Sequence, residues 1–241
     1  MELHVAFLPE EAGDCRRRAV AVVDVIRATT SLLIMAERGC DEVLIAPNLE
    51  VARAYAAAHP GVLLAGEQAG LAPAGFDFGN SPAALMTAPL AGRRVAFGTT
   101  NGTRALHHAR AAPVALVACL RNRTAAARAL AAAARAFGLD PMIVCAGREG
   151  RFGLDDAYTA GAMVEAMCAG EGAPVVELTD AAMAARDMFR AHPDAASLFR
   201  RTSAGRHVVE IGLDEDLGVC AQLDRSADVP RVGERVRLLD A

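Results

Sequence analysis

The chain has 241 residues, of which 53% are apolar and 22% charged, a composition that allows a sizeable core and excludes intrinsic disorder. Its formal net charge of −4 disfavours a general nucleic-acid binder, because such proteins carry a basic surface. No apolar run approaches the roughly 18 residues that cross a bilayer, and the N-terminus shows no leader peptide. We therefore expect a cytoplasmic protein that does not bind membranes.

Short β-branched runs alternate with alanine-rich segments of helical period through the first 147 residues. The predicted strands cover residues 19–25, 41–47, 61–66, 93–98, 113–118 and 141–147. The predicted helices between them cover residues 31–39, 49–58, 103–110 and 124–137. This alternation predicts an α/β fold with a mostly parallel sheet and helices on both faces. The last third is less regular, with predicted helices at 155–168 and 179–190 and an edge strand at 234–240.

The predicted elements form an internal repeat. Residues 19–90 and 93–170 are predicted to be two copies of one βαβαβ unit within a single α/β catalytic domain, residues 1–241. An α/β chain repeats at about this length by construction, so chance is the alternative. In parallel sheets ligands bind at the carboxyl ends of the strands. That edge would contain the loops 24–31, 66–81, 98–104 and 147–157.

All 25 basic side chains are arginine. Schiff-base chemistry and the lysine of a Walker A loop are therefore excluded. Anionic ligands would instead be held by guanidinium groups, backbone N–H groups and metal ions. The six cysteines form no CxxC pair and lie mostly in apolar runs, which predicts reduced thiols rather than disulfides.

The loop at 24–31 begins with a carboxylate and ends with hydroxyl groups. Asp24 closes a predicted buried strand, which is a common position for a metal ligand. Thr29 and Thr30 can cap the following helix and present its first N–H groups to an anion. The alternative interpretation is an ordinary strand end followed by a capped helix.

The loop at 98–104 is the stronger candidate for an anion site. Its glycines, including Gly102, free the backbone to approach a phosphate. Hydrogen-bond donors come from Thr99, Thr100, Asn101 and Thr103. The spacing does not fit a P-loop, and a plain hydrogen-bonded turn is the alternative.

Acidic side chains follow several predicted strands. Glu67 and Glu149 each come just beyond a buried strand, and Asp155 and Asp156 begin the next helix. Together with Asp24 they suit a Mg²⁺ ion that bridges protein and phosphate, because Mg²⁺ takes few carboxylates and keeps several waters. Acidic residues at a helix start also stabilise the helix dipole, which is the alternative for the aspartate pair.

A thiol phosphatase is a second possibility. Cys145 and Arg151 have the cysteine, five residues, arginine spacing of those enzymes, in which a thiolate attacks phosphorus. Two observations weigh against it. Cys145 continues an apolar run, and Glu149 would place a carboxylate inside the phosphate cradle.

Two further patterns carry no predicted function. The run Gly79-Asn80-Ser81-Pro82 lacks the second glycine of a serine hydrolase turn, and it predicts a turn in which Ser81 caps the next helix. The six histidines share no ligand spacing and are predicted to lie on the surface or at helix caps.

Five longer stretches combine these loops into a recognisable order. They are VDVIRATTS at 23–31, GEQAGLAPAGFDFGNSP at 66–82, GTTNGTRAL at 98–106, CAGREGRFGLDDAYTAGAMV at 145–164 and GLDEDLGVCAQLD at 212–224. In this order they resemble the 2-phosphosulfolactate phosphatase family, ComB. The resemblance covers nearly the whole chain.

The resemblance implies a ComB-like α/β fold and a Mg²⁺-dependent phosphatase. Such an enzyme converts 2-phospho-3-sulfolactate to 3-sulfolactate and phosphate, a step of coenzyme M biosynthesis. The substrate would be a small organic phosphate with carboxylate and sulfonate groups, which arginine can bind bidentately. Arginines in or beside the loops are Arg27, Arg104, Arg121, Arg148 and Arg151. A homodimer would suit an apolar chain of this size.

The hypothesis is phosphomonoester hydrolysis at this edge of the sheet. The expected metal ligands are Asp24, Glu67, Glu149 and Asp155. The expected catalytic residues are Asp24, Arg27, Glu149 and Asp156. The 98–104 loop and Arg27 would bind the phosphoryl oxygens, and either a water or the Asp24 carboxylate would attack phosphorus. A non-catalytic protein that binds organic phosphates is the remaining alternative.

Overall fold

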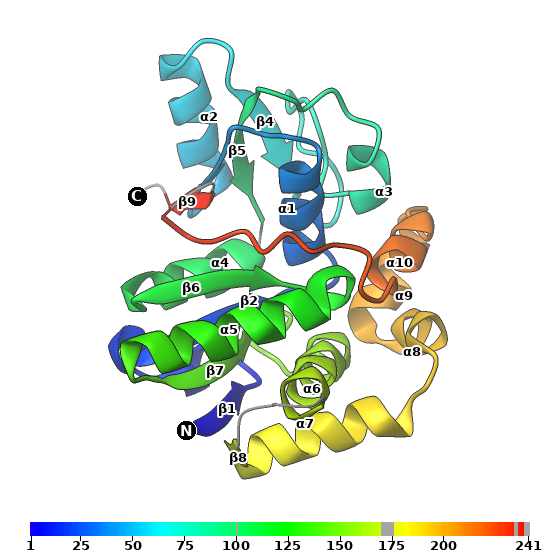
Figure 1. Ribbon diagram of the computed structural model, residues 1–241. Helices are drawn as coiled ribbons and strands as arrows, with labels where there is room; N and C mark the ends of the chain where they lie inside the picture. Colours follow the sequence, from blue (N-terminus) through cyan, green and yellow to red (C-terminus); the bar gives the residue numbers. More distant parts are fainter. Residues whose placement is uncertain (100, 170–175, 234–235, 239–241) are drawn as a thin grey trace.

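Two parallel β-sheets form the framework of the protein (Figure 1). The computed structural model describes residues 1–99, 101–169, 176–233 and 236–238. The five-stranded sheet has the order β6-β2-β7-β1-β8, and the four-stranded sheet has the order β4-β5-β3-β9. The strands are β1 (Glu2–Ala6), β2 (Arg18–Val23), β3 (Glu42–Ile45), β4 (Leu63–Gly66), β5 (Arg94–Gly98), β6 (Val114–Ala118), β7 (Asp140–Cys145), β8 (Glu177–Leu178) and β9 (Val236–Leu238). The predicted α/β class with parallel strands is confirmed, although two sheets take the place of the expected one.

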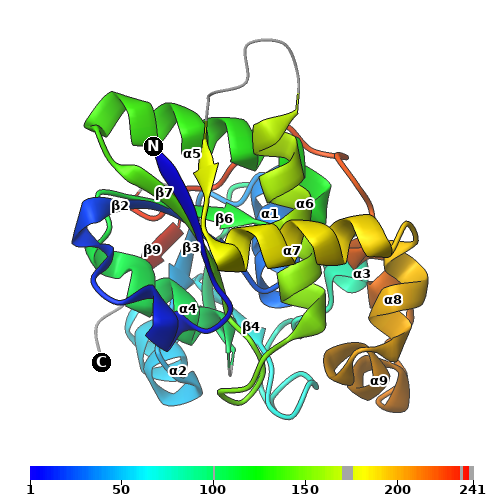
Figure 2. The same cartoon turned by 90° about the horizontal axis from the view of Figure 1, so that it is seen from below.

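Helices fill three layers around the two sheets (Figures 1 and 2). Helices α5, α6 and α7 cover the outer face of the five-stranded sheet, α1 and α4 lie between the sheets, and α2 covers the outer face of the four-stranded sheet. The smaller helices α3, α8, α9 and α10 pack at one end. The bounds are α1 (Ala28–Glu37), α2 (Leu49–Ala58), α3 (Pro82–Leu85), α4 (Gly102–His108), α5 (Arg123–Phe137), α6 (Leu154–Cys168), α7 (Asp180–Ala191), α8 (Ala195–Arg201), α9 (Ser203–Glu210) and α10 (Glu215–Cys220).

Strand β2 shows why the apolar runs are continuous rather than alternating. Val20 and Val22 face the core between the two sheets, whereas Ala21 and Val23 face the core beneath α5 and α6. Both faces of the strand are therefore buried, as expected for a parallel strand covered by helices on each side. Short single-turn 3₁₀ helices complete the fold at Pro9–Ala12, Cys15–Arg17, Ala109–Ala111 and Leu120–Asn122.

The two predicted repeat units exchange strands. The first unit contains β2, β3 and β4, and the second contains β5, β6 and β7. In the five-stranded sheet β2 lies between β6 and β7, whereas in the four-stranded sheet β5 lies between β3 and β4. The first strand of each unit is thus flanked by the second and third strands of the other. Two interlocked copies of one βαβαβ unit would have this arrangement.

Three terminal elements complete the sheets. Strand β1, which the apolar pattern does not predict, pairs with β7, and the two-residue β8 pairs with β1. The predicted C-terminal edge strand is confirmed over Val236–Leu238, where it pairs with β3. In the part of the chain that the structure describes, no helix has both the length and the apolar character needed to span a bilayer.

Candidate active site

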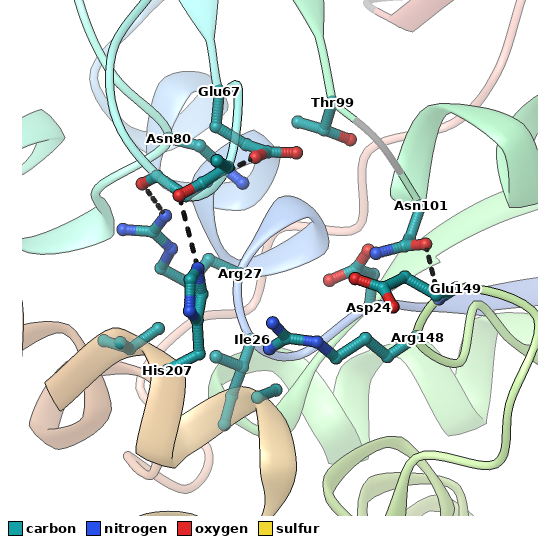
Figure 3. Close-up of a pocket in the computed structure, with 14 residues that line it drawn as sticks. Asp24, Ile26, Arg27, Glu67, Asn80, Thr99, Asn101, Arg148, Glu149 and His207 are labelled. Carbon is teal, nitrogen blue, oxygen red and sulfur yellow. Dashed lines mark hydrogen bonds between the residues drawn. The ribbon is translucent and has the colours of Figure 1, made fainter. Parts of the chain in front are cut away.

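A pocket opens where the carboxyl ends of both sheets meet (Figure 3). The loops after β2, β4, β5 and β7 line it, and α9 forms one wall. Its labelled residues in Figure 3 are Asp24, Ile26, Arg27, Glu67, Asn80, Thr99, Asn101, Arg148, Glu149 and His207. Three of the four predicted metal ligands and two of the predicted arginines therefore share one cavity. The fourth predicted ligand, Asp155, lines an adjoining cavity that also includes Asp24 and Arg148.

Asp24 lies at the centre of this arrangement. Its carboxylate is 7% exposed and accepts a 3.1 Å hydrogen bond from the backbone N–H of Ala28, the first residue of α1. Burial raises the pKa of Asp24 to about 7, and the nearby carboxylates of Asp155 and Glu67 act in the same direction. The pocket therefore brings several carboxyl groups together in a buried setting that disfavours their charged forms.

The two aspartates at the start of α6, Asp155 and Asp156, have different surroundings. Asp156 accepts hydrogen bonds through both oxygens, from Val25 N at 2.9 Å and from Gly147 N at 3.0 Å, so it joins the loops after β2 and β7. Burial raises the pKa of Asp156 well above its usual range. Asp155 is also buried, and desolvation raises its pKa to about 6. The contacts of Asp156 show that it positions the two loops. Its predicted catalytic role stays a prediction.

The two glycine-rich loops contain the same tight turn. In the loop after β4, φ is 51° at Ala69 and 83° at Gly70, and in the loop after β7 it is 52° at Glu149 and 72° at Gly150. Two backbone hydrogen bonds between the first and fourth residues close each turn. Asn101 Oδ1 accepts a 3.1 Å hydrogen bond from Glu149 N, which ties the second turn to the loop after β5. The pocket thus has two similar walls, one from each repeat unit.

Arg27 is held by a buried carboxylate that sequence reasoning missed. Its Nη1 donates to Asp216 Oδ2 at 2.7 Å, and the two side chains are 4% and 1% exposed. Asp216 Oδ1 accepts from Ser81 Oγ at 2.6 Å and from Ala83 N at 3.1 Å, so α10 is tied to the start of α3. A signal existed in the sequence, because Asp216 shares a helix face with the buried Val219 and Cys220.

A family model described as 2-phosphosulpholactate phosphatase matches residues 6–235, which include every loop that lines the pocket. The chain belongs to this family. It is 44% identical over 222 residues to the "Probable 2-phosphosulfolactate phosphatase" of Thermus thermophilus, covering 89% of this chain and 90% of that protein. A protein of the same name from Deinococcus radiodurans is 40% identical over 234 residues, covering 95% of this chain and 92% of the relative. The resemblance predicted from the five stretches is confirmed.

The structure brings only part of the family-like threonine pattern into the pocket. Thr99 lines the cavity, and its Oγ1 accepts a hydrogen bond from Thr103 N at 3.3 Å. The hydroxyl of Thr103 donates to Thr99 O, that of Thr29 to Asp24 O at 2.9 Å, and that of Thr30 to Val25 O at 2.8 Å. These three hydroxyls donate to backbone carbonyls of the loops before α1 and α4 and lie outside the pocket lining, so their contacts in this structure are structural and their predicted ligand contacts stay predictions.

Thr100 and Gly102 are the other predicted substrate-binding residues of the loop after β5. Thr100, predicted to bind substrate, lies outside the described residues. Gly102 begins α4 against the pocket carboxylate, where a Cβ atom would lie 2.8 Å from Asp24 Oδ2 and 2.4 Å from Ala28 Cβ. Gly102 therefore permits the close approach of two helices that start beside Asp24, and its predicted backbone contact with substrate stays a prediction.

The predicted arginines separate into two groups. Arg148 is half-buried and lines both cavities, and its Nη1 donates to Ser203 O at 3.3 Å. Arg121 was expected to bind substrate, but it lies outside the pocket lining and pairs with Glu37 at 3.1 Å and with Gln222. Its guanidinium forms a buried ion pair with Glu37 in this structure, and a substrate contact for Arg121 stays a prediction. Arg151 is exposed on the far side of its turn and is likewise absent from the described lining.

Cys145 does not have the properties of a nucleophilic thiol. It is the last residue of β7, is 1% exposed and lies outside the lining of the pocket among the described residues. Burial raises the pKa of its thiol well above the usual value, and the carboxylates of Asp156 and Asp155 raise it further. A phosphatase thiol needs the opposite, a lowered pKa and access to phosphorus. The thiol alternative is therefore disfavoured by the position of the residue itself.

Carboxylates surround the pocket without forming a closed metal cage. Within residues 1–99, 101–169, 176–233 and 236–238, no group of three or more His, Cys, Asp or Glu side chains is arranged to hold a metal ion. The carboxylates nevertheless supply hard oxygen donors, and Asp24 and Asp155 carry raised pKa values because their burial outweighs the opposing effect of Arg27 and Arg148. Such a donor set fits Mg²⁺, which is commonly bound through one or two carboxylates, several waters and a substrate phosphate.

Proposed function

We propose that the protein hydrolyses the phosphate monoester of 2-phospho-3-sulfolactate, giving 3-sulfolactate and phosphate as in coenzyme M biosynthesis, and that it requires Mg²⁺. One observation carries the proposal. The carboxylates of Asp24, Glu67 and Glu149 meet the guanidinium groups of Arg27 and Arg148 in one pocket (Figure 3). A phosphate ester with additional acid groups needs both kinds of side chain. Membership of the 2-phosphosulpholactate phosphatase family supports the same substrate.

Asp24 and Asp155, with Glu67 or Glu149 at the rim, would hold Mg²⁺. When bound, the ion supplies positive charge to the phosphoryl group and lowers the pKa of a water ligand. Arg148 sits beside these carboxylates and would bind phosphoryl oxygens, together with the Thr99 hydroxyl and the Asn101 carboxamide. Asp156 would keep the loops after β2 and β7 in register while the phosphoryl group is bound.

A phosphate-release assay tests this function directly. Purified protein stripped with EDTA is expected to release no phosphate from 2-phospho-3-sulfolactate, and Mg²⁺ is expected to restore turnover by at least about 100-fold. A panel of other 2-phospho acids measures the substrate range. Stabilisation of the protein by these compounds, with no phosphate release in the presence of Mg²⁺, would instead support a non-catalytic binding protein.

The substitution Cys145→Ser separates the metal-dependent reaction from a thiol mechanism. We expect kcat/KM to change by less than about 3-fold, because the thiol is buried outside the pocket and serine has nearly the same volume. The melting temperature should be measured alongside, since the buried hydroxyl is more polar than the thiol. Loss of turnover in a folded Cys145→Ser variant, combined with insensitivity to EDTA, would contradict the metal-dependent reaction.

A further inference from the structure

One end of the pocket contains polar side chains that have no role in the proposed hydrolysis of the phosphate ester. Figure 3 shows Arg27, Asn80 and His207 on one side, with the Glu67 side chain beside Asn80, whereas Asp24, Arg148 and Glu149 lie on the other. We call the first group, Arg27, Asn80 and His207, the cationic end. These three side chains come from the loop after β2, from the turn before α3 and from α9, respectively.

Arg27 is fixed in place at the cationic end. Its Nη1 is paired with Asp216 at 2.7 Å, and its Nη2 donates to Gly70 O at 2.5 Å. Asp216 is itself held by Ser81 Oγ and by the first turn of α3. A guanidinium clamped from two sides loses little side-chain entropy on binding an anion, and it presents its remaining N–H donors in one orientation.

Asn80 is the observation that points to a ligand. The residue is 4% exposed, lines the pocket and has a buried Oδ1 with no hydrogen-bond partner among the described residues. An unmatched buried polar atom costs roughly 1–3 kcal/mol, so a native site normally supplies a partner for it. A half-turn of the carboxamide exchanges Oδ1 for Nδ2, which places an N–H donor at the same point.

His207 completes the cationic end from the α9 side. Its Nε2 lies 3.2 Å from Ala69 O, and the helix packs so closely on the loop after β4 that a Cβ at Gly70 would lie 2.9 Å from Nε2. The φ of 83° favours glycine at that position, and the missing Cβ leaves room for the His207 ring beside the loop. The imidazole was expected on the surface or at a helix cap, but it borders the cavity.

We propose that the cationic end binds the sulfonate group of the substrate and makes the enzyme selective for sulfonated phosphoesters. This inference rests on the proposed function. In 2-phospho-3-sulfolactate the carboxylate is attached to the same carbon as the phosphate ester, whereas the sulfonate is one carbon further away. The group most distant from phosphorus belongs at the end of the pocket away from Asp24 and Glu149, although Glu67 lies beside that end and accepts a 2.8 Å hydrogen bond from Gly70 N. The clamped guanidinium of Arg27, the carboxamide of Asn80 and the imidazolium form of His207, which keeps an Nδ1–H while Nε2–H contacts Ala69 O, can each donate to a sulfonate oxygen. Arg27 thereby takes a sulfonate rather than the phosphoryl oxygens expected from the sequence.

The experiment compares two substrates that differ only in this group, 2-phospho-3-sulfolactate and 2-phospholactate. The measured quantity is the ratio of their kcat/KM values. The variants Asn80→Ala and His207→Gln are expected to lower this ratio by about 10- to 100-fold, the range for charge-assisted hydrogen bonds. Arg27 is left unchanged, because its removal would leave Asp216 buried without a partner. A merely structural role would reduce both kcat/KM values equally and leave the ratio unchanged.

Arg206→Gln is the matched control. Arg206 is exposed on the same helix, and its guanidinium donates to Arg201 O outside the pocket. Its loss should leave the ratio at the wild-type value. An unchanged ratio in both test variants, or a ratio near one in the wild-type enzyme, overturns the sulfonate assignment while phosphate release still supports the proposed function.

Calorimetric titration with 3-sulfolactate and with lactate gives a readout that does not depend on turnover. Wild-type protein is expected to bind 3-sulfolactate at least about 10-fold more tightly than lactate, and His207→Gln to abolish the difference. Equal affinity of the wild-type protein for the two compounds overturns the proposal even in a preparation that releases no phosphate. Absence of phosphate release from every ester, with preferential binding of 3-sulfolactate retained, contradicts the proposed function and supports the sulfonate site.

Discussion

Replacement of Asp24 by asparagine is expected to lower kcat/KM for phosphate release by roughly 10³-fold. The substitution keeps the volume of the side chain and an acceptor for Ala28 N, but it removes the charge that the pocket concentrates at its centre. Phosphate release from 2-phospho-3-sulfolactate at saturating Mg²⁺ measures the effect. Asp41→Asn is a suitable control, because that aspartate is exposed on the loop before β3 and lies outside the described pocket lining.

The same variant should alter how the stability of the protein depends on pH. In the folded protein Asp24 keeps its proton up to about pH 7, whereas an unfolded aspartate releases it near 3.8. The free energy of unfolding therefore falls as pH rises between about 4 and 7, because the native state must then carry a buried charge. The raised pKa of Asp155, about 6, acts in the same direction.

Melting temperatures between pH 4.5 and 8, without divalent cations, check this expectation. The wild-type melting temperature should fall relative to that of Asp24→Asn by several degrees at the upper end of the range. Added Mg²⁺ should raise the melting temperature of the wild-type protein more than that of the variant, because a bound ion stabilises only the state that holds it. A fully active Asp24→Asn enzyme, or parallel pH curves for the two proteins, would contradict the assigned role of the carboxylate.

The fold class could be predicted from the sequence, because it depends on the spacing of apolar residues and on the composition within each short segment. Runs such as 19–25 and 113–118 are buried on both faces, and their β-branched residues leave no alternative to covered parallel strands. Pairing between strands is not local. The apolar pattern of a strand does not show which other strand it pairs with. The exchange of β2 and β5 between the two repeat units therefore could not be predicted from the sequence pattern.

In the candidate site, too, local features could be predicted from the sequence and long-range pairings could not. Asp24, Glu67 and Glu149 could be placed together, because each follows a strand and parallel strands end at one edge. Arg121 also follows a strand, β6. Its guanidinium, however, forms an ion pair with Glu37 of α1 outside the pocket lining. Whether a loop arginine binds a ligand or an internal carboxylate depends on a partner distant in sequence. The pairing of Arg121 with Glu37 and the role of Asp216 could not be predicted from the sequence for this reason.

Substitution of Asp216 by alanine is expected to produce the largest loss of stability among these variants. Arg27 would keep its charge at 4% exposure without a carboxylate partner, and Ser81 Oγ and Ala83 N would lose their acceptor. Breaking a buried ion pair in this way costs about 3–5 kcal/mol. Urea denaturation measures the change in free energy of unfolding.

Two comparisons make this test specific to the buried pair. Asp216→Asn retains an acceptor for Ser81 and Ala83 but removes the charge, so its loss of stability should be smaller than that of alanine and should come from the Arg27 contact alone. Glu165→Ala breaks the exposed pair with Arg190, whose side chains are 31% and 53% exposed, and should cost less than about 1 kcal/mol. A loss in Asp216→Ala no greater than that in Glu165→Ala would mean that Arg27 finds another partner, and that the clamp at the cationic end does not depend on α10.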